Sequence, residues 1–199
     1  AETMGFSAQD RLCIPVPLYH CFGMVLGTLG CVTCGASMVF PGQAFEPAAT
    51  LQAVSEEACT ALYGVPTMFI AMLDHPDFDS HDYSSLRTGI MAGAPCPIEI
   101  MRRVVADMNM VEVTIGYGMT ETGSGVTILD PETPGGLDHR SVGWPLPGAR
   151  IGIVEAGEDG VGRIEIAGAM VGQGYWRLPD ETRRSFVDGR FLSSDLGRL

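Results

Sequence analysis

The chain contains no lysine, because all 12 of its basic residues are arginines. Any reaction step that depends on a lysine side chain must therefore obtain that group from outside these 199 residues. Acidic residues number 24 and give a net charge of −12. A basic surface large enough to neutralise several phosphates is not available, which argues against nucleic-acid binding.

Formal charge is absent from residues 12–45, where His20 is the only imidazole. A run of this length exceeds the roughly 20 residues that a membrane helix needs. Prolines and glycines interrupt it, however, and break any continuous helix. We therefore predict a buried strand over 12–16, a helix over 22–34 and a strand over 37–40, with no membrane span.

The 6 cysteines give little indication of a metal or redox site. Cys31 and Cys34 form a single C-x-x-C pair, with no second pair and no nearby histidine. Zinc and redox motifs usually bring further ligands, so either role is disfavoured. Free cysteines in apolar surroundings behave as small buried hydrophobes, and reduced thiols indicate a cytoplasmic location.

Strand and helix patterns alternate through the first two-thirds of the chain. The strand patterns cover 12–16, 37–40, 61–64, 86–92 and 111–115, and the helical patterns cover 22–34, 47–58, 65–73 and 97–108. Strands separated by helices are typical of a parallel sheet. The fold expected is α/β, with a doubly wound, mostly parallel sheet and helices on both of its faces.

The pattern changes in the proline- and glycine-rich stretch 131–140. Short alternating runs follow, together with one helical pattern over 180–186, and they predict a small β-barrel-like subdomain. We therefore divide the chain into an α/β part, 1–138, and a β-rich part, 139–199. The chain begins without methionine and ends within an apolar–polar alternation, so we expect both parts to be partial.

The heptad GYGMTET, residues 116–122, contains the chemically richest pattern. It follows the apolar run 111–115, and its glycines would let the backbone approach a ligand closely. The tyrosine ring can cover a flat base, the Thr120 hydroxyl can reach a phosphate, and the Glu121 carboxylate can hold a divalent cation. An ordinary strand-to-helix turn is the alternative, with Thr120 as N-cap and Glu121 in the first turn.

Several other segments of the chain also carry recognisable motifs. They are PLYH at 17–20, VGWPLPG at 142–148, the run 168–176 that ends in GYW, and SSDLG at 193–197. Together with the heptad they resemble the adenylate-forming superfamily, which includes acyl-CoA synthetases, beetle luciferases and the adenylation domains of peptide synthetases. The resemblance covers almost the whole chain, and several motifs in register are far more specific than one.

Enzymes of this superfamily join a carboxylate to AMP with release of pyrophosphate, and then pass the acyl group to a thiol such as CoA. The resemblance therefore implies ATP, Mg²⁺ and CoA as cofactors and substrates. It implies nucleotide contacts from Gly93, Ala94, Pro95, Gly116, Tyr117, Gly118, Met119, Thr120 and Asp195.

Individual roles follow from the same resemblance. Tyr117 would stack on the adenine, with residues 93–95 on the opposite face of the base. Thr120 would contact phosphate, Glu121 would hold Mg²⁺, and Asp195 would accept hydrogen bonds from both ribose hydroxyls. From the residues alone, Asp195 could equally be a turn or cap aspartate.

The resemblance places His20 at the wall of the carboxylate pocket, where it could orient the incoming acid as a third catalytic group beside Thr120 and Glu121. A histidine flanked by aromatic residues is more often part of the core, and that alternative stays open. The resemblance implies an acyl tunnel lined by apolar side chains, although such residues are often plain core. The tunnel candidates are Phe22, Val65, Phe69, Met91 and Met119.

The chain departs from the superfamily pattern in two motifs. Ile115 replaces a residue that is often polar, so recognition of the adenine edge would depend on the backbone. Ser194 replaces a glycine in the final motif, while Ser193 keeps a hydroxyl two residues before Asp195.

The phosphate loop with its lysine, and the carboxyl-terminal domain with its catalytic lysine, are not found within these residues. We therefore expect the chain by itself to be inactive. The phrase LYGVPTMF at 62–69 is most similar to the fatty-acid-activating branch. The prediction is a parent acyl-CoA synthetase that acts on small molecules. The alternatives are an adenylating enzyme that loads a carrier protein and a non-catalytic nucleotide-binding module.

Overall fold

The computed structural model describes residues 1–129 and 141–199, which divide into two compact units. Unit 1 comprises Ala1–Tyr117 and the described part of Ile128–Trp144, and unit 2 comprises Gly118–Thr127 and Pro145–Leu199. The predicted boundary between 138 and 139 lies outside the described residues. Unit 2 also contains the 118–127 stretch, which the sequence-based division assigned to the first part.

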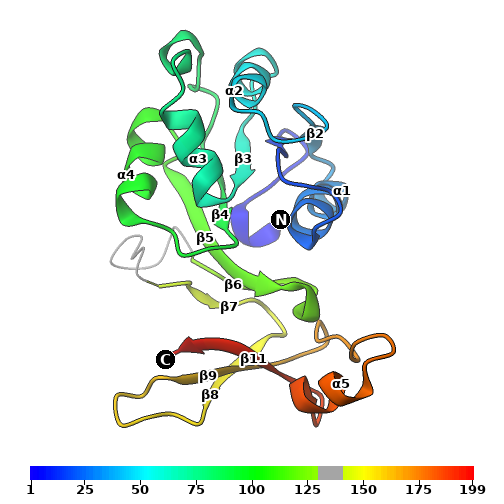
Figure 1. Cartoon of the computed structure of the whole chain (residues 1–199). Coiled ribbons are helices and arrows are strands. Elements are labelled where there is room, and N and C mark those ends of the chain that lie inside the picture. Colours follow the sequence, from blue (N-terminus) through cyan, green and yellow to red (C-terminus); the bar gives the residue numbers. More distant parts are fainter. Residues whose placement is uncertain (130–140) are drawn as a thin grey trace. The chain divides into compact units, whose positions relative to one another are not determined.

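Parallel strands form the centre of unit 1 (Figure 1). Parallel pairing gives the order β2-β1-β3-β4-β5, and the order continues to β6 and β7 in a seven-stranded sheet. The strands are β1 (Arg11–Cys13), β2 (Ser37–Val39), β3 (Ala61–Gly64), β4 (Thr88–Ala92), β5 (Glu112–Met119), β6 (Ser124–Ile128) and β7 (Trp144–Pro145). The predicted parallel sheet is confirmed.

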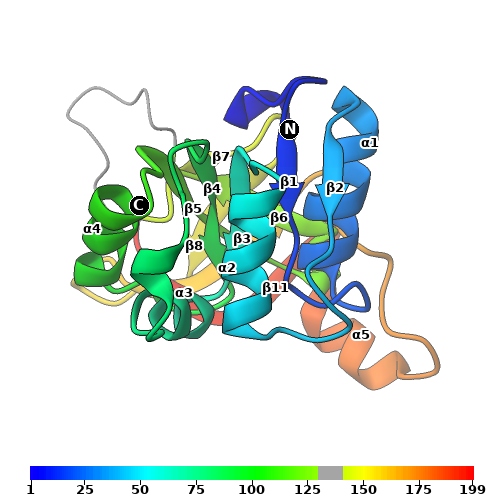
Figure 2. The same cartoon turned by 90° about the horizontal axis from the view of Figure 1, so that it is seen from above.

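Helices connect the parallel strands, as the alternating sequence pattern predicted. They are the π-helix η2 (Phe22–Leu29), α1 (Gly30–Cys34), α2 (Pro47–Glu56), α3 (Pro66–Leu73), η3 (Phe78–Ser80) and α4 (Ile98–Asp107), while η1 (Glu2–Met4) precedes the first strand. Helices α2, α3 and α4 lie next to one another (Figures 1 and 2).

The connections of this sheet run in two directions. From β1 the chain moves to β2, then returns past β1 to β3, β4 and β5. Because such crossovers are right-handed, the first connection lies on the face opposite α2, α3 and α4. The change of direction between β1 and β3 makes their carboxyl ends a switch point, where ligands bind in doubly wound sheets.

The central strands are buried on both faces. Every residue of β3 and of β4 is buried, which explains why their sequences are apolar without alternation. Phe69, Met72 and Leu86 are fully buried in the cluster that fills the space between sheet and helices. Among the described residues, no helix combines the length and apolar character needed to cross a membrane.

The strand predicted over 12–16 is shorter in the structure, where β1 ends at Cys13. Ile14 still donates its N–H to the carbonyl of Val39 at 2.9 Å. Pro15 and Pro17 have no N–H group, so they cannot extend the ladder.

The helix predicted over 22–34 is present, but its first part is the π-helix η2. This element packs closely on the loop that precedes it. A Cβ on Gly23 would lie 2.4 Å from the carbonyl oxygen of Pro17, so only glycine fits there. Periodicity alone does not distinguish a π-helix from an α-helix over eight residues.

The predicted turn at Gly116 is wrong, because β5 continues through the two glycines to Met119. The chain reverses only in the 3-10 turn η4 (Thr120–Thr122), which leads into β6. A Cβ on Gly118 would lie 1.6 Å from the carbonyl oxygen of Ser124. The glycine therefore permits a tight hairpin. The alternative with Thr120 as the N-cap of a helix is also wrong, since a strand follows.

Unit 2 contains a curled antiparallel sheet with the order β10-β11-β9-β8. Its elements are β8 (Arg150–Val154), β9 (Gly162–Ala167), α5 (Pro179–Ser185), β10 (Phe186–Val187) and β11 (Arg190–Gly197). The β-rich subdomain with one short helix is confirmed. Strand β11 pairs with β9 along its length, and its register shifts between Leu192 and Leu196. Such a shift marks a bulge, and bulges often redirect side chains next to sites.

Candidate functional site

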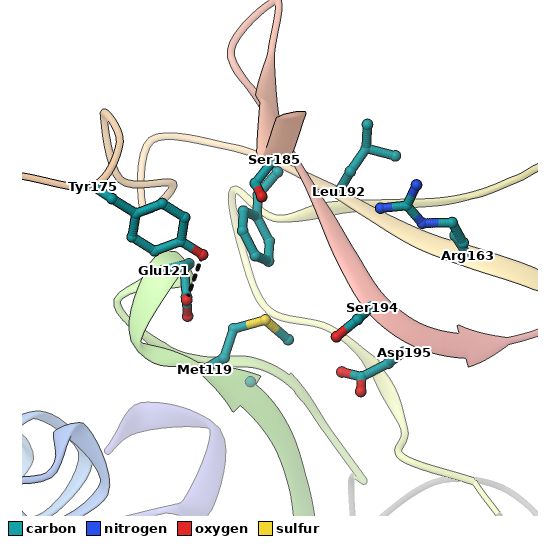
Figure 3. Close-up of a pocket in the computed structure, with 10 residues that line it drawn as sticks. Met119, Glu121, Arg163, Tyr175, Ser185, Leu192, Ser194 and Asp195 are labelled. Atoms are coloured by element: carbon teal, nitrogen blue, oxygen red, sulfur yellow. Dashed lines mark hydrogen bonds between the residues drawn. The ribbon is translucent and has the colours of Figure 1, made fainter. Parts of the chain in front are cut away.

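A cavity of about 380 Å³ lies within unit 2. Its volume is in the range of small-molecule pockets. The lining residues are Gly118, Met119, Glu121, Arg163, Tyr175, Ser185, Phe191, Leu192, Ser194 and Asp195 (Figure 3). Four of them, Gly118, Met119, Glu121 and Asp195, were predicted as site residues. The structure therefore brings the heptad and the final motif to one pocket.

Glu121 is held at two points by the segment that follows β9. Its Oε1 atom accepts a hydrogen bond of 2.7 Å from the Tyr175 hydroxyl, shown as a dashed line in Figure 3. Its backbone carbonyl accepts a second bond, of 2.8 Å, from the Gly172 N–H. Burial, followed by the hydrogen bond and charge of Glu121, raises the pKa of Tyr175. The tyrosine therefore stays a protonated donor at neutral pH.

Asp195 reaches the pocket through the bulge in β11. Its backbone N–H donates to the Oγ of Ser193 at 3.1 Å, and Ser193 is buried. Arg163 donates its Nε–H to the Ser193 carbonyl at 3.2 Å. Ser194 does not adopt a positive φ, so its backbone does not require the glycine usual in the superfamily.

Thr120 is exposed and is the first residue of η4, directly before Glu121. It is not among the residues that line the cavity. Tyr117 is half-buried on β5 and belongs to unit 1. Ile115 is buried in the hydrophobic core, so its side chain does not reach the surface of the strand end.

Residues 93–95 lie in unit 1, where they leave the carboxyl end of β4 and are exposed. In the sheet, Ala92 at the end of β4 pairs with Gly116 of β5, so residues 93–95 and Tyr117 directly follow paired residues of neighbouring strands. Gly93 has a φ of 85°, a conformation that favours glycine. The exposed, side-chain-poor segment next to an aromatic residue suits a flat base.

His20 is exposed, which contradicts the interpretation of it as a core histidine. It follows β1, whose carboxyl end borders the switch point of unit 1. Its Nδ1 accepts a hydrogen bond of 3.1 Å from the Phe22 N–H. A neutral imidazole with this bond carries its proton on Nε2.

The candidate acyl-tunnel residues divide into two groups. Phe69 and Met91 are fully buried in the core cluster, which favours a packing role for both. Phe22 is buried and stacks on Tyr63, with ring centroids 5.4 Å apart. Val65 and Met119 are half-buried, and Met119 lines the cavity of unit 2.

Sequence reasoning missed several lining residues, above all Tyr175 and Arg163. Tyr175 belongs to the GYW motif, so an aromatic residue within a recognised motif was the available signal. Arg163 had no comparable signal, because its position beside Ser193 depends on the pairing of β9 with β11.

The arrangement of acidic side chains in the described residues is compatible with a magnesium ion that binds together with a nucleotide. No group of three or more histidine, cysteine or acidic side chains that could form a metal cage exists among them. Mg²⁺ commonly uses one or two carboxylates together with substrate phosphates and water. Glu121 at the pocket fits that pattern. Cys31 is buried, and burial raises the pKa of its thiol to about 11, which fits an inert residue.

Residues 1–176 match the family described as "AMP-binding enzyme". Among curated proteins, YngI of Bacillus subtilis is 46% identical over 98% of this chain and 37% of its own length. The acyl-CoA ligase sidI of Aspergillus fumigatus is 42% identical over 94% of this chain and 32% of its own length. The mitochondrial medium-chain acyl-CoA ligase ACSF2 of Mus musculus is 42% identical over 86% of this chain and 29% of its own length. The chain thus spans about a third of the curated relatives it matches.

Solved structures give the same assignment. The O-succinylbenzoate coenzyme A synthetase MenE of Bacillus subtilis, in complex with ATP and magnesium, has a TM-score of 0.81 and 29% identity. That comparison covers 100% of this chain and 41% of MenE. A benzoate CoA ligase of Burkholderia xenovorans has a TM-score of 0.85 and 25% identity. That comparison covers 97% of this chain and 40% of the ligase. Motifs, fold and relatives agree: the chain belongs to the family of AMP-binding enzymes, the adenylate-forming superfamily that its sequence resembles.

Proposed function

We propose that this chain is part of an ATP-dependent acyl-CoA synthetase that activates a carboxylic acid as its adenylate and transfers the acyl group to CoA. The observation that carries the proposal is the cavity of unit 2, lined by both Glu121 and Asp195. These carboxylates come from two distant motifs of the same superfamily. The acyl-CoA ligases among the relatives support the same reaction.

The first half-reaction requires a carboxylate oxygen to approach the anionic α-phosphate of ATP. Positioning and charge neutralisation matter more than proton transfer in such a step. When bound, Mg²⁺ would supply positive charge that offsets the charge of the phosphates. Glu121 would hold that ion at the pocket, Thr120 would contact a phosphate, and Asp195 would accept hydrogen bonds from the ribose hydroxyls.

The unit 1 residues have complementary proposed roles. Tyr117 would stack on the adenine, and the exposed backbone of residues 93–95 would cover its other face. Because Nδ1 of His20 is engaged with the backbone, Nε2 is the atom that could donate to a substrate carboxylate. That bond would orient the acid for attack on the phosphate.

The proposal also specifies the cofactors, the acid substrate and the cellular location. We propose ATP, Mg²⁺ and CoA as cofactor and substrates, a fatty acid as the acid, and the cytoplasm as the location. The acidic composition gives no support for a nucleic-acid partner. An enzyme that loads a carrier protein and a non-catalytic nucleotide-binding module are the competing functions.

Product analysis of the full-length protein tests the proposal. The protein is incubated with ATP, Mg²⁺, a panel of fatty acids and either CoA or a phosphopantetheinyl carrier, and the thioesters are identified by mass spectrometry. Acyl-CoA formation with pyrophosphate release is the expected result. Transfer only to the carrier, or nucleotide binding without pyrophosphate release, would overturn it in favour of one of the alternatives. The 199-residue chain alone serves as a control and should be inactive.

A further inference from the structure

Two hydrogen bonds join the segment after β9 to Glu121 in the η4 turn. Gly172 donates its backbone N–H to the Glu121 carbonyl at 2.8 Å, and Tyr175 donates its hydroxyl to Oε1 at 2.7 Å. A Cβ on Gly172 would lie 3.2 Å from the same carbonyl, which is tighter than most such contacts. The close backbone approach therefore favours glycine and brings Tyr175 within reach of the carboxylate.

Tyr175 is fixed from its other side by helix α5 and strand β10. Its backbone N–H donates to the Oγ1 of Thr182 at 2.9 Å. The edge of its ring packs on Phe186, with ring centroids 5.3 Å apart and an interplanar angle of 78°. Phe186 in turn packs on Phe191 at 5.0 Å. A ring held in this way directs its hydroxyl in advance of ligand binding.

Glu121, by contrast, extends from a short 3-10 turn and is only half-buried. A glutamate there has several rotatable bonds, and fixing them costs conformational entropy when a ligand binds. A hydrogen bond from an ordered donor removes much of that cost in advance. The bond to Oε1 also leaves Oε2 outside this contact.

We propose that Tyr175 is a positioning residue for Glu121 and orients its carboxylate for the magnesium ion that accompanies ATP. The inference rests on the proposed function, in which Glu121 holds that ion. Partners that orient metal-binding side chains typically change metal affinity by about 10- to 100-fold when they are removed. Because Glu121 is half-buried and loses one neutral donor, the lower end, about 10-fold, is expected.

Tyr175→Phe in the full-length protein is the direct test, since it removes the hydroxyl and keeps the packed ring. The probe is Mn²⁺ binding in the presence of a non-hydrolysable ATP analogue, followed by electron paramagnetic resonance. The Mg²⁺ dependence of ATP–pyrophosphate exchange is measured in parallel. We expect the half-saturating metal concentration to rise about 10-fold in both experiments.

Tyr83→Phe is the matched control, because the Tyr83 hydroxyl also donates a 2.7 Å hydrogen bond, to the Phe78 carbonyl in unit 1. This variant should bind Mn²⁺ like the unchanged protein. Thr182→Val removes the acceptor of the Tyr175 N–H with little change of shape, and should raise the metal requirement in the same direction. It provides a second measurement if Tyr175→Phe folds poorly.

Glu121→Gln separates failure of this inference from failure of the proposed function. If Glu121→Gln weakens Mn²⁺ binding while Tyr175→Phe and Thr182→Val do not, Tyr175 has no positioning role. If Glu121→Gln also leaves Mn²⁺ binding unchanged, the metal role of Glu121 itself is wrong. An equal loss of ATP-analogue affinity at all metal concentrations would indicate a merely structural role for Tyr175 and would overturn the proposal.

Discussion

The Ser193 hydroxyl accepts a hydrogen bond of 3.1 Å from the backbone N–H of Asp195, within the bulge of β11. Ser193 is buried and Asp195 is exposed, so the bond connects the interior of the sheet to the pocket lining. The bulge is also held by Arg163 through the Ser193 carbonyl. The proposed ribose contact of Asp195 therefore depends on a neighbour that would not touch the ligand.

Ser193→Ala should weaken ATP binding without removing any proposed ligand contact. A neutral hydrogen bond of this kind contributes about 0.5–1.5 kcal/mol, which corresponds to roughly a 2- to 12-fold rise in the ATP KM. Ser193→Thr keeps the hydroxyl and should restore most of the affinity. Steady-state kinetics of the full-length protein provide the measurement. A normal ATP KM in Ser193→Ala would show that the bulge keeps its shape without this bond.

Asp195→Ala should reduce ATP affinity far more than Ser193→Ala. Hydrogen bonds to a charged acceptor contribute about 1.5–3 kcal/mol each, so the loss of two should cost two or more decades in affinity. Glu158→Ala, another exposed acidic position of unit 2, serves as the charge-matched control. Direct ATP titration by calorimetry distinguishes the variants. Equal affinity in Asp195→Ala and the control would reject the ribose role.

Gly118→Ala should disturb the hairpin formed by β5, η4 and β6. The added methyl group would lie 1.6 Å from the Ser124 carbonyl oxygen, so one of the two strands must move. Overpacking of this kind costs about 1–3 kcal/mol. Gly30→Ala is the control, because its nearest contact would be 3.8 Å away within a helical stretch. Urea unfolding should show a lower midpoint for Gly118→Ala alone.

The sequence predicted those features that depend on local patterns. Apolar runs located the parallel strands of unit 1, and helical periodicity located α2, α3 and α4. Two motifs, GYGMTET and SSDLG, supplied Glu121 and Asp195, and both of these residues line one cavity. Each motif is short, and it was their order along the chain that made the family recognisable.

Features that depend on tertiary pairing were not predictable in the same way. Strand β5 continues through Gly116 and Gly118 because β4 and β6 pair with it, although glycine has low strand propensity. The contact between Tyr175 and Glu121 requires the segment after β9 to reach the η4 turn. No local pattern in either segment encodes the other.

Asp10→Asn should make the fold less stable at neutral pH and change its response to acid. Asp10 is buried and accepts bonds from the Thr60 hydroxyl at 2.7 Å, the Ser7 N–H at 2.8 Å and Arg87 at 2.9 Å. Burial alone would raise its pKa, but these bonds and the charge of Arg87 outweigh burial and lower it. Because the folded-state pKa is below the unfolded value of about 3.9, the stabilisation is present above that pH. It is lost as the pH falls through the lowered pKa.

At pH 7, Asp10→Asn should therefore reduce the free energy of unfolding by about 1.5–3 kcal/mol. The difference from the unchanged protein should shrink as the pH falls below about 4, where the unfolded state begins to bind the proton, and should be lost below the lowered pKa of the native carboxylate. Urea titrations of the full-length protein at several pH values measure both effects, with the exposed Asp188→Asn as control. A constant difference down to pH 2 would contradict the assignment.

Glu121→Gln should slow adenylation while sparing thioester formation from preformed acyl-adenylate. The substitution keeps the shape of the side chain and removes the charge that would hold Mg²⁺. Metal is needed while negative charge builds up on the departing pyrophosphate, and the second step begins after pyrophosphate has left.

The structure removes the simplest competing explanation for an effect of this substitution, because Glu121 lies in a hairpin turn rather than in the first turn of an α-helix. Glu181→Gln is the matched control, since Glu181 does lie in the first turn of α5 and pairs with Arg184. Single-turnover kinetics at several Mg²⁺ concentrations measure the rate of each half-reaction separately in both variants. If Glu121→Gln slows both halves equally, or neither, the carboxylate does not serve the metal.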